Sequence, residues 1–81
     1  MMIRLKAESR ACLLDSTQPG TLLHDVLAGA PVITRQGDPP GGLYELECSD
    51  AGCRELRLAA ASFCPDALAE IEAQLRGRSP A

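Results

Sequence analysis

The alternation of hydrophobic and polar positions is most regular between residues 43 and 60. From residue 43 to 48, and again from 55 to 60, apolar and polar side chains follow each other with a period of two, which is typical of strands with one buried face. Between these runs, residues 50–52 suit a three-residue loop, with Gly52 in its left-handed position. The pattern therefore predicts a β-hairpin across residues 43–60.

The register of this hairpin decides how its cysteines are interpreted. In that register Leu46 faces Leu56, and Leu58 points to the same core side. Cys48 then lies on the core side, whereas Cys53 lies on the outer side. Because the two sulfur atoms point apart, the pair suits neither a zinc site nor a disulfide. We expect one packed thiol and one surface thiol.

A capped amphipathic helix follows the hairpin. Cys64 occupies the N-cap position, and Pro65 suits the first helical residue, where its missing N–H would have no partner. Asp66 adds negative charge to the first turn, where the helix dipole favours it. We expect this helix to end at Gly77 and to bury an apolar stripe at helical spacing. The stripe consists of Leu68, Ile71 and Leu75.

The first half of the chain carries shorter patterns. Residues 3–7 alternate as a half-buried strand, and the apolar run 11–14 favours a second short strand. Apolar residues at helical spacing predict a short helix from about residue 20 to residue 28. Residues 32–34 follow a proline and suit a further strand, and residues 36–42 form a loop by composition.

Together these elements predict a small α+β domain. We expect an antiparallel or mixed sheet of four or five strands, with two helices packed on one face. The domain spans residues 1–77, and residues 78–81 form a C-terminal tail. A chain of 81 residues buries only ~60–65% of the surface that it exposes when unfolded, so the core is small. Dimerisation through an apolar patch would be an ordinary remedy, and a homodimer is one expected assembly.

The composition excludes several classes of function. The net charge of −3 and the lack of a Lys/Arg stripe disfavour direct nucleic-acid binding, which needs cations at the phosphates. One Tyr and one Phe are too few aromatic residues to stack bases or to wall a deep ligand pocket. No apolar run approaches the ~20 residues of a membrane span, and the N-terminus lacks the features of a signal peptide. We therefore expect a cytoplasmic protein that needs no cofactor.

Four cysteines in so short a chain raise the alternatives of a disulfide framework and a metal site. Without a secretory signal the disulfide framework loses its oxidising compartment, which favours buried and reduced thiols. A metal site built from Cys12, His24, Cys53 and Cys64 has no support in their spacing. We expect no metal ion.

The outer face of the predicted hairpin is acidic. Glu45 pairs with Arg57 across the two strands, whereas Glu47 lies opposite Glu55, where like charges repel. Such a face is either solvated surface or a patch that meets a basic partner, where the repulsion would be relieved. We favour a non-enzymatic protein-binding module, such as a regulator, an inhibitor or an accessory subunit. Its partner-binding residues would be Glu45, Glu47, Asp50 and Glu55.

Cys64 supports a different class of function. The positive end of a helix dipole stabilises a thiolate at the N-cap and makes it a better nucleophile. A sulfur-carrier or redox protein that uses Cys64 is therefore the alternative. Against it, Ala67 takes the place of the second cysteine of a Cys-x-x-Cys pair, and Asp66 opposes a thiolate. The sequence shows no acid–base constellation and no phosphate-binding loop, so an enzyme is the less favoured class.

Overall fold

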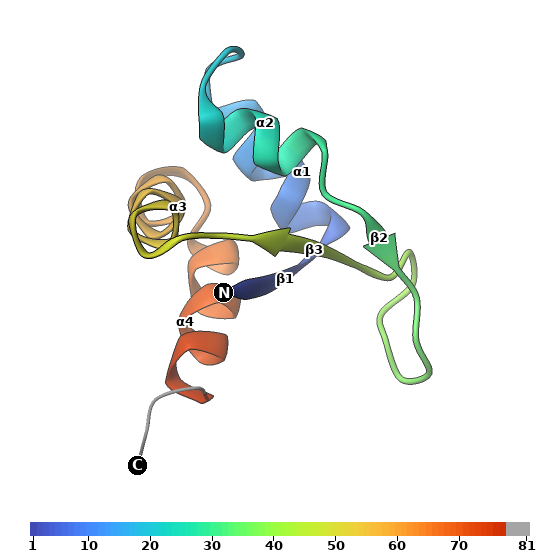
Figure 1. Cartoon of the computed structure of the whole chain (residues 1–81). Coiled ribbons are helices and arrows are strands. Elements are labelled where there is room, and N and C mark those ends of the chain that lie inside the picture. The colour runs from blue at the N-terminus through green and yellow to red at the C-terminus, as the bar shows by residue number, and fades with distance from the viewer. Residues whose placement is uncertain (78–81) are drawn as a thin grey trace.

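The computed structural model describes residues 1–77 and shows an α+β domain in which these residues form a three-stranded antiparallel sheet and four helices (Figure 1). In chain order the elements are β1 (Met2–Lys6), α1 (Ala7–Ser16), α2 (Leu22–Ala28), β2 (Val32–Ile33), β3 (Leu43–Glu47), α3 (Asp50–Phe63) and α4 (Pro65–Gly77). The expected α+β class is confirmed, whereas the expected four or five strands and two helices are wrong. The predicted tail at residues 78–81 lies outside the described residues.

β3 is the central strand of the sheet, and β1 and β2 pair with it on either side. β1 and β3 run antiparallel, with Ile3 opposite Leu46 and Leu5 opposite Tyr44. The alternation that predicted the first strand places Ile3 and Leu5 in the core, because successive side chains of a strand point to opposite faces. The sheet therefore offers one apolar face to the helices.

All four helices contribute to a single core with that face. Helices α1, α2 and α4 contact the sheet, and α3 packs against α1 and α4. Each helix contributes a fully buried aliphatic side chain, and these are Leu13, Leu27, Leu56 and Ile71. As Figure 1 shows, the C-terminal α4 runs beside the N-terminal β1, which brings the two ends of the described chain together in space.

Side chains of α4 also occupy the outer edge of β1. The Arg4 N–H donates a hydrogen bond to Gln74 Oε1 at 2.7 Å, and Gln74 Nε2 donates one to the Arg4 carbonyl oxygen at 2.6 Å. The Lys6 N–H donates to Glu70 Oε1 at 3.0 Å. These side chains therefore satisfy backbone groups of β1 that no strand of the sheet pairs.

The predicted hairpin is wrong in its second half. Strand β3 forms as expected, but the predicted turn and return strand are replaced by α3. Ser49 is the N-cap of this helix, because its Oγ accepts a hydrogen bond from the Gly52 N–H at 3.1 Å. Gly52 thus belongs to the first helical turn and not to a β-turn. The buried positions of α3 recur with helical spacing, and they are Cys53, Leu56 and Ala60.

This change from strand to helix moves several side chains. Cys53, which was predicted on the surface, is buried, and Leu58, which was predicted in the core, is 70% exposed. Residues 11–14, which were predicted as a short strand, lie within α1. The N-terminal strand, the short helix that ends at Ala28, the strand after Pro31 and the C-terminal helix are confirmed, with the bounds given above.

Candidate functional sites

Glu45, the first of the predicted partner-binding residues, is enclosed by the protein's own cations. Its side chain is only 10% exposed, and Oε2 accepts hydrogen bonds from Arg4 Nε at 2.8 Å and from Arg35 Nη2 at 3.3 Å. The predicted pair with Arg57 is wrong, because Arg57 lies on α3 and contacts Glu72 at 3.4 Å. Glu45 therefore fixes the segment after β2 to the sheet and is not available to a partner.

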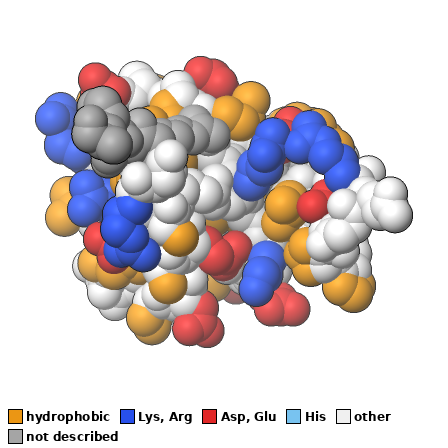
Figure 2. All heavy atoms as spheres, turned by 90° about the horizontal axis from the view of Figure 1, so that it is seen from below, with side chains coloured by type: hydrophobic (Ala, Val, Ile, Leu, Met, Phe, Trp, Pro, Cys, Tyr) orange, Lys and Arg blue, Asp and Glu red, His pale blue; other side chains and the backbone are white. Residues whose placement is uncertain are grey.

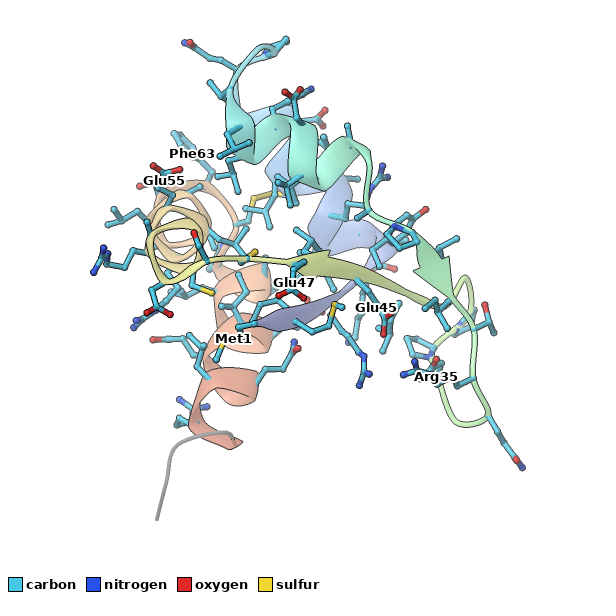
Figure 3. The ribbon with its side chains drawn as sticks, viewed as in Figure 1. Met1, Arg35, Glu45, Glu47, Glu55 and Phe63 are labelled. Carbon is cyan, nitrogen blue, oxygen red and sulfur yellow. A yellow bond between two sulfur atoms is a disulfide. The ribbon has the colours of Figure 1, made fainter. Side chains whose placement is uncertain are left out.

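The other three acidic residues are exposed, but their arrangement differs from the prediction. Glu47 ends β3, Asp50 begins α3, and Glu55 lies further along α3. Glu47 and Glu55 are not cross-strand neighbours, yet both border one cleft, and Figure 3 shows them on β3 and α3 respectively. Glu47 Oε1 also contacts the amino group of Met1 at 2.9 Å, which raises the pKa of that amino group.

This α2–α3 cleft is small and mainly apolar. Its volume is about 90 Å³, and besides the two glutamates it is lined by Leu22, Leu23, Val26, Cys48, Ser49 and Gly52. Leu22 is 79% exposed, more than any other large hydrophobic side chain of residues 1–77. An exposed leucine beside an apolar hollow with carboxylates at its border suits an aliphatic side chain that has basic neighbours.

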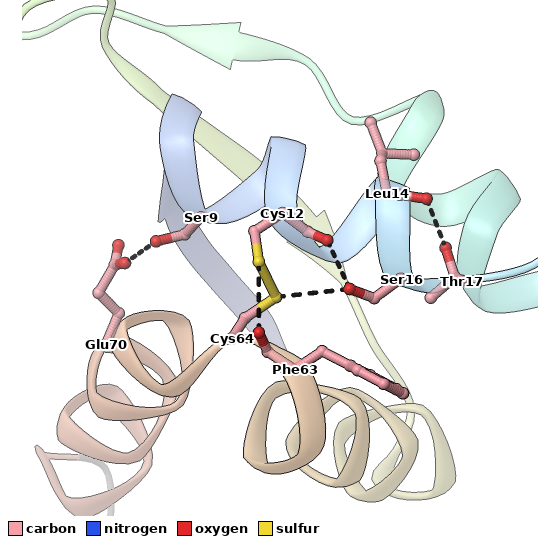
Figure 4. Close-up of a disulfide and its surroundings, with 8 residues drawn as sticks. All are labelled: Ser9, Cys12, Leu14, Ser16, Thr17, Phe63, Cys64 and Glu70. Atoms are coloured by element: carbon pink, nitrogen blue, oxygen red, sulfur yellow. Dashed lines mark hydrogen bonds between the residues drawn. A yellow bond between two sulfur atoms is a disulfide. The ribbon is translucent and has the colours of Figure 1, made fainter.

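A disulfide joins Cys12 to Cys64 (Figure 4). The expectation of reduced thiols is therefore wrong for this pair, because α1 brings Cys12 against the junction of α3 and α4. Cys64 ends one helix and begins the next: its N–H donates to the Ala60 carbonyl at 2.8 Å, and its carbonyl accepts from the Leu68 N–H at 3.0 Å. The predicted N-cap position of Cys64 is confirmed. Ser16 Oγ lies 3.7 Å from Cys64 Sγ.

The disulfide lies in a second and larger cleft between α1 and α4, which we call the α1–α4 cleft. It has a volume of about 460 Å³, and both cysteines line it. Its charged lining residues are Lys6, Glu8, Asp66 and Glu70. Figure 4 shows Glu70 directed at Ser9, whose hydroxyl donates to Glu70 Oε2. With one cation against three carboxylates, the lining is negatively charged.

Cys48 and Cys53 are free thiols, and both are buried. They occupy the position before the N-cap of α3 and its fourth helical position, which contact each other in a hydrophobic staple. Burial raises the pKa of the Cys48 thiol to about 11, and the neighbouring Cys53 adds to this effect. The prediction that these two side chains point apart is therefore wrong. At neutral pH Cys48 is a packed, protonated thiol.

Three comparisons with known proteins leave the function to be argued from these clefts. No protein-family model matches the chain, and neither a curated protein nor a solved structure is significantly similar to it.

Within residues 1–77, no three His, Cys, Asp or Glu side chains are gathered to hold a metal ion. The same part of the chain has no helix with the length and apolarity needed to cross a membrane. On the face in Figure 2, Lys and Arg side chains lie among Asp and Glu.

Reasoning from the sequence did not predict that Leu22 is exposed beside a cleft or that Cys12 forms a disulfide. The four large apolar residues of α2 span roughly 140° of the helix surface at 100° per residue, and Leu22 lies at one edge of that span. This edge position was the available signal that Leu22 could be exposed. For Cys12 there was no comparable signal, since 52 positions separate it from Cys64 and cysteine connectivity depends on the fold.

Proposed function

We propose that this protein is a non-enzymatic protein-binding module whose α2–α3 cleft binds a basic and apolar segment of a partner protein. The observation that carries the proposal is the position of Glu47 and Glu55 at the border of an apolar hollow, beside the exposed Leu22. A regulator, an inhibitor or an accessory subunit would act through such a surface. We further propose that it acts in the cytoplasm.

The apolar part of the cleft supplies the anchor for one side chain. A hollow of about 90 Å³ has the size of one side chain and is too small for a helix. Covering Leu22 at the same time removes an exposed leucine from water, and full burial of such a side chain contributes ~1.5–3 kcal/mol. The partner segment therefore needs at least one Val, Leu or Ile at its centre.

The charges at the border define the flanks of that segment. Glu47 and Glu55 are exposed and line the cleft, and the exposed Asp50 lies between them in the sequence, at the start of α3. Lys or Arg residues on either side of the apolar anchor would meet these carboxylates, and at Glu47 they would compete with the amino group of Met1, which lies 2.9 Å from Oε1. Exposed pairs of this kind contribute little affinity each, but they orient the partner and accelerate its association.

The test compares capture of the natural partner by the wild-type protein and by variants of the cleft. Immobilised wild type, the double variant Glu47→Gln/Glu55→Gln, and Leu22→Ser would each be incubated with lysate of the source organism. We expect a partner that the wild type retains at low salt to be lost by both variants. Its capture by the wild type should also fall as salt rises, because exposed charges are screened within ~8–10 Å at physiological ionic strength.

The matched control is Glu72→Gln, which removes a carboxylate of the same type outside this cleft. Glu72 lies on α4 and contacts Arg57. We expect it to retain the partner at wild-type level, and all variants should keep the far-UV circular dichroism of the wild type. Equal recovery of one partner by every variant at both salt concentrations would refute the proposal. Sedimentation velocity over a range of protein concentrations identifies the case in which the partner is a second copy of the chain.

A further inference from the structure

We propose that the Cys12–Cys64 disulfide undergoes exchange with thiols that carry positive charge, and that Cys12 is the sulfur that they attack. This activity belongs to the α1–α4 cleft and is independent of partner binding at the α2–α3 cleft. Three features carry it: the position of the disulfide in the larger cleft, the unequal exposure of its two cysteines, and the charges around it.

The two cysteines differ in their access to solvent. Cys64 is 4% exposed at the junction of α3 and α4, whereas Cys12 is partly exposed on α1 and lines the cleft. Which sulfur a thiolate attacks depends on access, so a thiol that enters the cleft meets Cys12 first. If the protein acts in the cytoplasm, as proposed above, this bond would belong with the transient, catalytic or redox-sensing disulfides of that compartment.

Attack on Cys12 makes Cys64 the leaving group. The start of α4 favours a departing thiolate at Cys64, whereas the carboxylate of Asp66 opposes it. The Cys64 carbonyl accepts the first backbone hydrogen bond of the 13-residue α4, so the Cys64 sulfur lies at the positive end of the helix dipole. Ser16 Oγ donates a hydrogen bond to the Cys12 carbonyl oxygen at 2.8 Å and lies 3.7 Å from Cys64 Sγ, so a rotation of its hydroxyl would let it donate to the departing thiolate instead. A stabilised leaving thiolate accelerates exchange.

The exchange proceeds in two displacements. First, the thiolate of an external thiol forms a bond to Cys12 Sγ, the Cys12–Cys64 bond breaks, and Cys64 leaves as a thiolate that takes up a proton from water. A second external thiolate then attacks the external sulfur of the mixed disulfide and releases Cys12 as a thiolate. The protein disulfide gains two electrons, and the two external thiols lose two as they become one disulfide.

The charges that line the α1–α4 cleft determine which external thiols react fastest. Lys6 is the one cation among the charged lining residues, against Glu8, Asp66 and Glu70. An anionic thiol is therefore repelled as it approaches, whereas a cationic one is attracted. The natural reactant would be a thiol with a neighbouring amine or basic side chain.

The experiment uses three small thiols on the oxidised, folded protein: cysteamine (cationic), 2-mercaptoethanol (neutral) and 2-mercaptoethanesulfonate (anionic). Each rate is divided by the rate of the same thiol with bis(2-hydroxyethyl) disulfide, which removes differences in intrinsic reactivity. Samples quenched with N-ethylmaleimide and digested show which cysteine carries the external thiol. We expect the adduct on Cys12, the maleimide on Cys64, rates proportional to thiol concentration, and cysteamine fastest.

Variants then test the charge selection. Asp66→Asn removes a carboxylate from the cleft, and at low salt it should lower the cysteamine-to-sulfonate rate ratio by on the order of fivefold, because the lost charge attracts the cationic thiol and repels the anionic one. The matched control is Asp25→Asn, which removes an acidic residue from the first turn of α2, outside this cleft. It should leave the ratio unchanged.

Several outcomes would overturn the proposal. Adducts mainly on Cys64 would reverse the assignment of the attacked sulfur. Rates that do not depend on thiol concentration but rise with low concentrations of urea would show that the bond opens only after unfolding. Equal normalised rates for the three thiols, or an equal effect of Asp66→Asn and Asp25→Asn, would remove the charge selection.

Discussion

Breaking the Cys12–Cys64 disulfide should remove a large part of the stability of this domain. The bond closes a loop with a sequence separation of 52, which restricts the unfolded chain. In the chain-entropy model the loss is 2.1 + 1.5R ln 52, or about 14 cal/mol/K, which corresponds to ~4 kcal/mol at 25 °C. A domain of this length has a total unfolding free energy of roughly 4–12 kcal/mol. The reduced protein should therefore be marginally stable.

Urea denaturation followed by far-UV circular dichroism measures this loss. The oxidised wild type, the wild type in excess tris(2-carboxyethyl)phosphine, and Cys12→Ala/Cys64→Ala should be compared. We expect a lower midpoint and a steeper urea dependence after reduction, since an unrestricted unfolded chain exposes more surface. The variant is the control, because its unfolding curve should not respond to the reductant. A loss below ~1 kcal/mol on reduction would refute the reasoning and show that packing alone holds α1 to the C-terminal helices.

Three further predictions test the fold and one titrating group. Leu56→Ala should cost ~2–4 kcal/mol of unfolding free energy, whereas Leu58→Ala should be nearly neutral; equal costs would favour a strand over α3. Gly42→Ala should cost at least ~1 kcal/mol more than Gly41→Ala in urea denaturation. Both glycines have positive φ, but a Cβ at Gly42 would lie 2.7 Å from a carbonyl oxygen of β2, whereas one at Gly41 meets open space. Because the folded-state pKa of Cys48 is raised from 9.0 to about 11, its stabilising effect is complete below pH 9 and is lost as the pH rises towards 11. Denaturation curves from pH 8 to 11 should show this loss in the wild type, and a similar loss in Cys48→Ala would contradict it.

The elements that were predicted correctly are those whose hydrophobic pattern fits only one period, either that of a strand or that of a helix. In β1, Ile3 and Leu5 alternate with cations, and no helical stripe connects them. In α4, the proline at the first position, the acidic first turn and the apolar stripe all agree. Such agreement between independent local signals is what makes an element predictable.

Residues 50–63 failed because their pattern admits two periods. Leu56, Leu58 and Ala60 alternate as in a strand, but Cys53, Leu56 and Ala60 also lie on one helical stripe. Intrinsic propensity should have decided between them. The segment has no Val, Ile or Thr and is rich in Ala, Leu, Glu and Arg, which are strong helix formers. The prediction of the acidic site therefore rested on a wrong strand register. Two of its four residues line one cleft only because the end of β3 lies beside α3.

The amide of Gln74 acts on β1 as a neighbouring strand would, since it bonds to both the N–H and the carbonyl of Arg4. Glu70 does the same for the N–H of Lys6. An unpaired strand edge is a template on which other chains can add and aggregate, and proteins protect such edges with covering elements. β2, the strand at the other edge of the sheet, is two residues long, so it offers little edge on which another chain could add. Recognition of an extended peptide as an added strand, a common mode of peptide capture, is therefore blocked on the β1 side.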